Sequence, residues 1–293
     1  MKAEKKRVGT KAQIRAEKGR ERRVATAIFL AIILASAALS AYFGYTILNP
    51  STPLNSNEPT LQFKPENPNP KLKAAMVDQL SPTAPNETFT QTAVAILTQA
   101  SYTVDYFSGQ RVTVDFYRNL PTCGYTLIVL RAHSGLERNM DGVERGRVDL
   151  FTCESYSTSR YVYEQLAGRV ACVMFLRGGS RYFGVSSPFI KECMNGKFAN
   201  TIMIMMGCNG LKYTSVAQAF TEKGAKACVS WTGSVSSSHT DQAATRLLEH
   251  LVTEGQAISQ AVENTAGEVG PDEACDSTLS YYPLASGNCA IQG

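Results

Sequence analysis

Residues Thr201 to Leu211 read TIMIMMGCNGL, and this stretch decides the fold of the chain. The apolar run Ile202 to Met206 is too short for a membrane span and stops at a glycine, which is typical of a strand buried on both faces of a parallel sheet. Open α/β sheets bind their ligands at the carboxyl ends of the strands, where Cys208 would lie. Helical spacing from Val216 to Phe220 predicts that Cys208 occupies a tight turn near a helix N-terminus, which favours the reactive thiolate. A small buried thiol without a chemical role is the alternative.

A second stretch has the same construction. The apolar strand Thr126 to Leu130 runs on into His133, Ser134 and Gly135. If the two strands are neighbours in a parallel sheet, His133 and Cys208 come within hydrogen-bonding reach, as a cysteine nucleophile and its base require. Backbone N–H groups of Cys208 and of Ser134 or Gly135 would then form the oxyanion hole. For His133 alone, a strand-end histidine with a satisfied hydrogen bond is the alternative, and His239 is an alternative base.

Strands and helices alternate along residues 72–293, which favours a mostly parallel sheet covered by helices on both faces, a three-layer αβα sandwich. The predicted strands are 74–80, 102–107, 126–130, 170–176, 181–185, 202–206 and 227–232. The predicted helices are 87–100, 112–120, a segment near 158–167, one from about 216 to Gly224, 239–253 and 256–264. The segment after His133, with Asp141, Glu144 and Asp149, is predicted as a solvated loop. His250 is predicted to lie on the surface, away from the leucines of its helix.

The N-terminal residues predict a membrane anchor. Residues 1–23 hold ten Lys or Arg against three Glu, so this cytoplasmic tail carries +7 and the rest of the chain about −3 of the formal +4. The basic pI therefore belongs to the tail and gives no support for nucleic-acid binding. Residues 24–48 hold no charge and are long enough for a transmembrane helix, with a cleaved signal peptide as the competitor. Because the basic flank precedes this helix, the N-terminus is predicted in the cytoplasm and the rest outside the cell membrane.

A linker follows the predicted anchor. Residues 49–71 contain six prolines among many Asn and Ser, which is typical of a semi-extended tether. Asn86, Glu87 and Thr88 match the sequon for N-glycosylation, a short signal that agrees with an outside location.

The two strand-end blocks carry a family resemblance. LIVLRAHSG and TIMIMMGCNG resemble the hydrophobic strands that end in the catalytic histidine and cysteine of the caspase-like cysteine peptidases, the group of gingipains, legumains, separases and metacaspases. The segment AFTEKGAKACVSWTGSVS resembles the part of these proteins that follows the nucleophile. The resemblance spans about 73–264 and implies that Cys208 is the nucleophile and His133 the base. It also implies a caspase-like α/β domain over 72–293.

Substrate recognition is expected at the end of the strand 227–232. Trp231 and Thr232 are candidates for lining the pocket of the residue before the cleaved bond, and Asp241 could bind a basic side chain there. A carboxylate in the first turn of a helix, complementing the helix dipole, is the alternative for Asp241. No metal-binding motif, phosphate loop or serine-hydrolase motif is present, so we expect no cofactor and no metal.

The remaining cysteines bear on the redox state of the domain. Eight cysteines in a domain outside the cell predict disulfides, and Cys275 with Cys289 is the best candidate pair. Cys172 and Cys228 lie in apolar strands and are expected to be reduced and buried.

The sequence therefore predicts a membrane-anchored cysteine endopeptidase that cleaves peptide or protein substrates through Cys208 and His133. The alternative is an ectodomain of the same fold that is catalytically inactive and binds a partner at the strand ends. A sensor for a small solute is a weaker third possibility. The sequence does not indicate an oligomeric state.

Overall fold

The computed structural model describes residues 72–139, 141–175, 179–272 and 274–291. The predicted tail 1–23, transmembrane helix 24–48 and linker 49–71 lie outside these residues. Within the described residues, no helix is both long enough and apolar enough to cross a bilayer.

The central sheet is mostly parallel, as the sequence predicts. Its strand order is β10-β9-β8-β3-β1-β2, and every neighbouring pair from β9 to β2 is parallel, whereas β10 joins the edge in the antiparallel direction. The strands are β1 (Lys73–Asp78), β2 (Thr103–Ser108), β3 (Leu127–Arg131), β8 (Ile202–Met205), β9 (Ala227–Trp231) and β10 (Leu279–Tyr282). The short strand β10 is absent from the sequence prediction.

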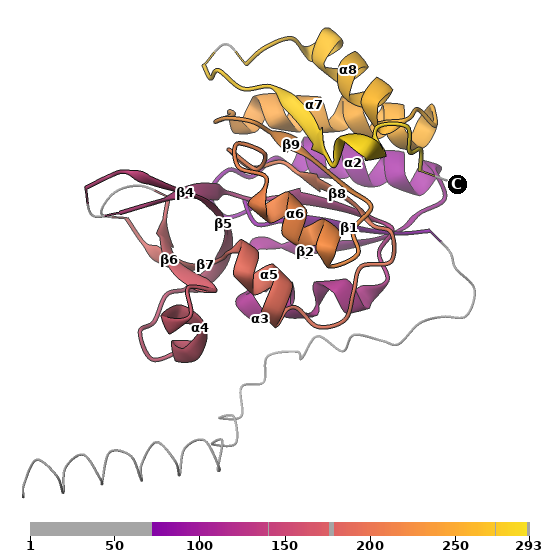
Figure 1. Ribbon diagram of the computed structural model, residues 1–293. Helices are drawn as coiled ribbons and strands as arrows, with labels where there is room; N and C mark the ends of the chain where they lie inside the picture. The colour runs from indigo at the N-terminus through magenta and orange to yellow at the C-terminus, as the bar shows by residue number, and fades with distance from the viewer. Residues whose placement is uncertain (1–71, 140, 176–178, 273, 292–293) are drawn as a thin grey trace, which may run out of the picture. The chain divides into compact units, whose positions relative to one another are not determined.

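Helices cover both faces of this sheet (Figure 1). On one face, α2 (Glu87–Gln99), α7 (Ser237–Leu248) and α8 (Ile258–Val269) share one apolar core with alternate residues of the strands. The other face carries α3 (Val114–Asn119), α5 (Ser187–Cys193) and α6 (Ser215–Glu222). Because both faces are buried, the inner strands read as unbroken apolar runs, and the α/β fold class is confirmed. The short helical turns are η1 (Gly109–Arg111), η2 (Leu120–Cys123), the π-helical η3 (Glu249–Thr253) and η4 (Leu284–Ser286).

A second sheet is built almost wholly from the chain between β3 and α5. Its antiparallel strands, in the order β4-β5-β7-β6, are β4 (Ser134–Arg138), β5 (Glu144–Ser155), β7 (Arg181–Val185) and β6 (Val170–Met174), with the helix α4 (Val162–Leu166) beside them. The prediction of a loop after His133 is therefore wrong, since most of this segment belongs to β5. Asp149, predicted to be solvated, is buried, and burial raises the pKa of its carboxyl to about 6. The first half of β5 is open to solvent and carries the charged residues Glu144, Arg145 and Arg147. The apolar pattern by which a strand is recognised in the sequence is therefore missing there.

Candidate functional site

The two reactive residues occupy equivalent places on neighbouring strands. Strands β3 and β8 pair in parallel with Leu130 opposite Met205, and the N–H of Met206 donates to the carbonyl of Leu130 at 2.9 Å. His133 and Cys208 each lie three residues beyond this last pair. The predicted adjacency of the two strands is confirmed, and both residues arrive at the same edge of the sheet.

The loops that carry these residues are in contact. The Ser134 hydroxyl donates a hydrogen bond to the carbonyl of Cys208. A Cβ on Gly207 would lie 2.3 Å from Ser134 Oγ and 2.4 Å from the carbonyl oxygen of Ala132. Only glycine permits this approach, so Gly207 is the residue that lets the cysteine loop close against the histidine loop.

The Cys208 thiol lies beside the start of α7. Its Sγ accepts from the N–H of Val235 and donates to the Val235 carbonyl, both at 3.5 Å, and Val235 immediately precedes Ser236, the N-cap of α7. The predicted tight turn is present, because Asn209 has the left-handed φ of +59°. The N–H of Asn209 donates to the carbonyl of Gly233 at 2.7 Å. The sequence placed the thiol near the helix that follows it in the chain, but the helix whose start it contacts is α7.

The His133 ring lies in an aromatic environment supplied largely by the second sheet. Its ring centroid is 4.1 Å from that of Phe175 and 6.0 Å from that of Phe151. Burial, assisted by the positive charge of Arg131, lowers the pKa of His133 to about 4. The imidazole is therefore neutral at neutral pH, which is the state that accepts a proton.

The loop after β1 fixes the orientation of His133. The side-chain oxygen of Gln79 accepts from the His133 N–H at 2.9 Å, and Thr83 Oγ1 lies 3.3 Å from the ring nitrogen Nε2. Among the described residues, no hydrogen bond joins His133 to the Cys208 thiol. The structure thus brings the two residues to one edge, with the imidazole engaged by Thr83.

Asp241 lies inside the fold, where its carboxylate is fully engaged. One oxygen accepts from Arg131 Nε at 2.7 Å, and the other accepts from Arg131 Nη2 and from Asn86 Nδ2, both at 2.8 Å. Arg131 is 1% exposed and also pairs with Asp78 at 2.8 Å. Asp241 is 4% exposed and lies beyond the first turn of α7, so neither role expected for it matches its surroundings. The side-chain nitrogen of Asn86, which N-glycosylation would modify, is the atom that donates to Asp241.

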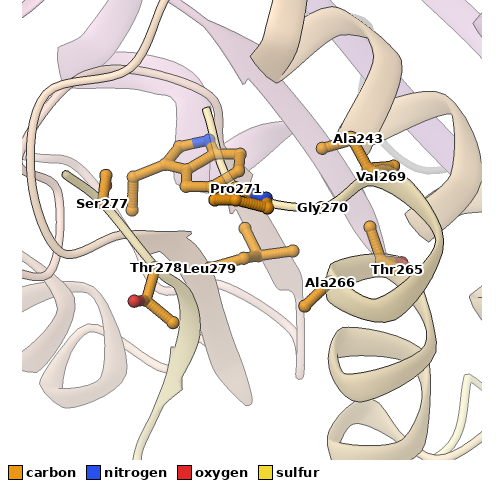
Figure 2. Close-up of a pocket in the computed structure, with 10 residues that line it drawn as sticks. Ala243, Thr265, Ala266, Val269, Gly270, Pro271, Ser277, Thr278 and Leu279 are labelled. Carbon is orange, nitrogen blue, oxygen red and sulfur yellow. The ribbon is translucent and has the colours of Figure 1, made fainter. Parts of the chain in front are cut away.

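Trp231 and Thr232 separate at the end of β9. Trp231 turns into the core, where its indole N–H donates to Thr240 Oγ1 at 2.8 Å. It also lines a pocket on the face of the sheet covered by α7 and α8 (Figure 2). Thr232 is exposed and bonds to Thr278 through its N–H and its hydroxyl, each at 3.0 Å. Of these two residues, Trp231 lines this pocket and Thr232 does not.

The expected oxyanion donors are distributed over both loops. The N–H of Cys208 donates to no other residue in the described part of the chain, so it remains available to a developing negative charge. Ser134 and Gly135 begin β4, with Gly135 opposite Asp149. His239, the alternative base, lies in the first turn of α7, and its Nε2 is buried without a partner among the described residues.

All eight cysteines are free thiols, so the predicted disulfide between Cys275 and Cys289 is not formed. Cys228 is buried as expected, but Cys172 is exposed because β6 has one face open. Cys275 lies near the candidate nucleophile. Burial, and to a smaller extent Asp272 and Cys208, raise the pKa of its thiol.

The sequence interpretation missed several residues that shape this edge. Gln79 and Thr83 follow β1, and the rule that found His133 and Cys208 at strand ends could have found them too. Phe175 and Val235 carry no such signal, since their roles depend on contacts between distant parts of the chain.

The chemistry available at this edge is that of a thiol, a neutral imidazole and backbone N–H groups. Within the described residues, no group of three or more His, Cys, Asp or Glu side chains could hold a metal ion. No protein-family model matches the sequence, and no curated protein matches it.

Proposed function

We propose that this chain is a cysteine endopeptidase of the caspase-like type, with Cys208 as nucleophile and His133 as base. The observation that carries the proposal is the equivalent placement of the two residues, each three positions beyond the paired Leu130 and Met205. Parallel strands deliver the residues that follow them to a common edge, which is where α/β proteins assemble their sites. The two stretches that resemble the caspase-like peptidases are the two that end at this edge.

In the proposed reaction, neutral His133 accepts the thiol proton while Cys208 Sγ attacks the carbonyl carbon of the peptide. The negative charge on the carbonyl oxygen is held by the N–H groups of Cys208 and of Ser134 or Gly135. His133 then gives its proton to the leaving amine, and a thioester to Cys208 remains. A water molecule, deprotonated by His133, hydrolyses this thioester and restores the thiol. The imidazole has to exchange its contact with Thr83 for the thiol, and such tightening on substrate binding is common.

The low pKa of His133 determines which proton transfers the imidazole can make with Cys208 and with the leaving amine. A pKa of about 4 means that the imidazole is neutral and able to accept a proton at neutral pH, but it is then a weak base, because general-base catalysis is most efficient when the pKa lies near the working pH. Its role as a donor to the amine depends on the proton that it has just received from Cys208.

The proposed cellular setting comes from the N-terminal sequence. Residues 24–48 would anchor the enzyme in the cell membrane with the tail 1–23 in the cytoplasm, and 49–71 would tether the domain outside.

The test is cleavage of a peptide library, with varied residues before the cleaved bond, by the full chain. We expect Cys208→Ala to abolish cleavage and His133→Ala to lower kcat/KM by about 10²–10⁴-fold. His239→Ala is the matched control, and it should cleave like the unaltered chain. Cleavage that survives in Cys208→Ala contradicts the proposal, and loss of cleavage only in His239→Ala assigns the base to the other histidine.

A binding ectodomain is the second candidate function, and the contact between His133 and Thr83 is the observation that favours it. An imidazole that contacts Thr83 and Phe175 can line a peptide-binding site without acting as a base. Peptides that bind more tightly to the unaltered chain than to His133→Ala, without cleavage, would support this function.

A further inference from the structure

A pocket of about 170 Å³ opens between β9, β10, α7 and α8. Trp231 lines it, and Figure 2 shows Leu279 and the connection Gly270–Pro271 among the other residues around it. The side chains of Ala243, Val269 and Leu279 make its walls largely apolar.

The pocket has a buried floor and an exposed rim. Trp231, Thr265 and Leu279 are buried, whereas Ala266 and Thr278 are exposed. A void sealed inside the core would have buried residues on all sides, so this hollow is open to solvent. Thr265 lies behind this floor and is fully buried, so its hydroxyl is out of reach of a ligand in the pocket.

The wall of the pocket is joined to the Cys208 loop by main-chain hydrogen bonds. The N–H of Leu211 donates to the Trp231 carbonyl at 2.9 Å, and the N–H of Asn209 donates to the Gly233 carbonyl at 2.7 Å. On the opposite side, the Gly233 N–H donates to Ser277 Oγ, which belongs to the rim, at 2.8 Å. The end of β9 therefore has the nucleophile loop on one side and the pocket on the other.

We propose that this pocket receives one aromatic side chain of the peptide that reacts at Cys208. This inference rests on the proposed function and gives it a substrate class. An apolar cavity of about 150 Å³ holds a benzene ring, so the volume here suits a single ring. A basic side chain would find no carboxylate among the residues that line the pocket.

Trp231 offers a direct readout of occupancy, because it is the only tryptophan in the chain. The experiment uses the full chain carrying Cys208→Ala, so that no peptide is turned over. Tryptophan emission is followed during titration with phenol and with blocked tripeptides that contain Tyr, Phe or Lys. We expect saturable changes with phenol and with the Tyr and Phe peptides, and no saturable change with the Lys peptide.

One variant locates the ligand. Ala266→Phe fills the entrance from the exposed rim, leaves the buried floor untouched, and should abolish the response to phenol. The urea midpoint of this variant confirms that the domain is folded.

The outcomes separate the pocket from the peptidase. If phenol gives no saturable change, or still binds to Ala266→Phe, the pocket assignment is overturned. If phenol binds but the peptides show no dependence on the aromatic residue, the ligand is a free small molecule and the substrate assignment falls. If aromatic peptides bind at Trp231 while the unaltered chain cleaves none of them, the pocket stands and the proposed function fails.

Discussion

His133 and Cys208 end neighbouring strands, yet their surroundings differ. The imidazole lies against the rings of Phe151 and Phe175, and its burial keeps it neutral. The thiol lies among backbone groups at the start of α7, bonded to Val235. The central sheet thus decides where the two residues are, while two separate elements, the second sheet and α7, decide the state of each.

Arg131 connects the elements around this edge. It ends β3, pairs with Asp78 at the end of β1 and with Asp241 of α7, and donates to the carbonyl of Ala84 in the loop that carries Thr83. The positions of both reactive residues therefore depend on one buried cation.

The largest effect is expected from breaking that connection. Arg131→Met leaves two buried carboxylates facing each other, so the free energy of unfolding should fall by about 3–5 kcal/mol. Urea denaturation followed by the fluorescence of Trp231 measures it. Arg138→Met removes an exposed pair with Glu144 and should cost no more than about 1 kcal/mol. Equal losses in both variants would show that the buried network does not organise the edge.

A smaller effect is expected where the two loops touch. Gly207→Ala places a methyl group against Ala132 and Ser134, so the free energy of unfolding should fall by about 1–3 kcal/mol. The rate of alkylation of Cys208 should change as well. Gly267→Ala is the matched control: its Cβ meets nothing within 4 Å, and alanine within α8 should stabilise the domain by about 0.5–1 kcal/mol. If Gly207→Ala changes neither the free energy of unfolding nor the alkylation of Cys208, the loops are not held together at this point.

The smallest effect concerns the titration of His133. Phe175→Ala removes the ring that packs against the imidazole, so the pKa of His133 should rise from about 4 toward its ordinary 6.5. Because Phe175 is 55% exposed, the fold should be unaffected. NMR titration, with Leu166→Ala as an exposed control, measures the change.

The same substitution should alter how stability depends on pH. A histidine with a lower pKa in the folded state than in the unfolded state stabilises the fold above about pH 6.5 and loses that contribution as the pH falls toward 4. The loss should be smaller in Phe175→Ala. An unchanged pKa of His133 would show that Phe175 does not control its solvation.

The central sheet could be predicted from the sequence because its strands are buried on both faces and read as apolar runs. The same reasoning failed for β5, whose first half is exposed and charged. It failed for His250, which is 3% exposed, because η3 is a π-helical turn and shifts the buried face of the helix. The partner of Asp241 could not be found at all, since Arg131 is 110 residues away in the chain.

The placement of Cys208 and His133 at one edge followed from the two strand ends. The residues that set their chemical state did not. Phe175 and Val235 come from segments that no local pattern links to the strands, so their contacts appear only in the folded chain.

The most direct measurement is the rate of alkylation of Cys208 between about pH 5 and pH 8 in the full chain, resolved by peptide mapping. Cys172, an exposed thiol whose pKa is raised by partial burial, is the internal reference. If His133 accepts the thiol proton, Cys208 should react faster than Cys172 throughout this range. His133→Ala should remove this advantage, and His239→Ala should leave it. Equal rates for Cys208 and Cys172 in the unaltered chain, or a Cys208 rate indifferent to His133, would contradict the role of His133 as base.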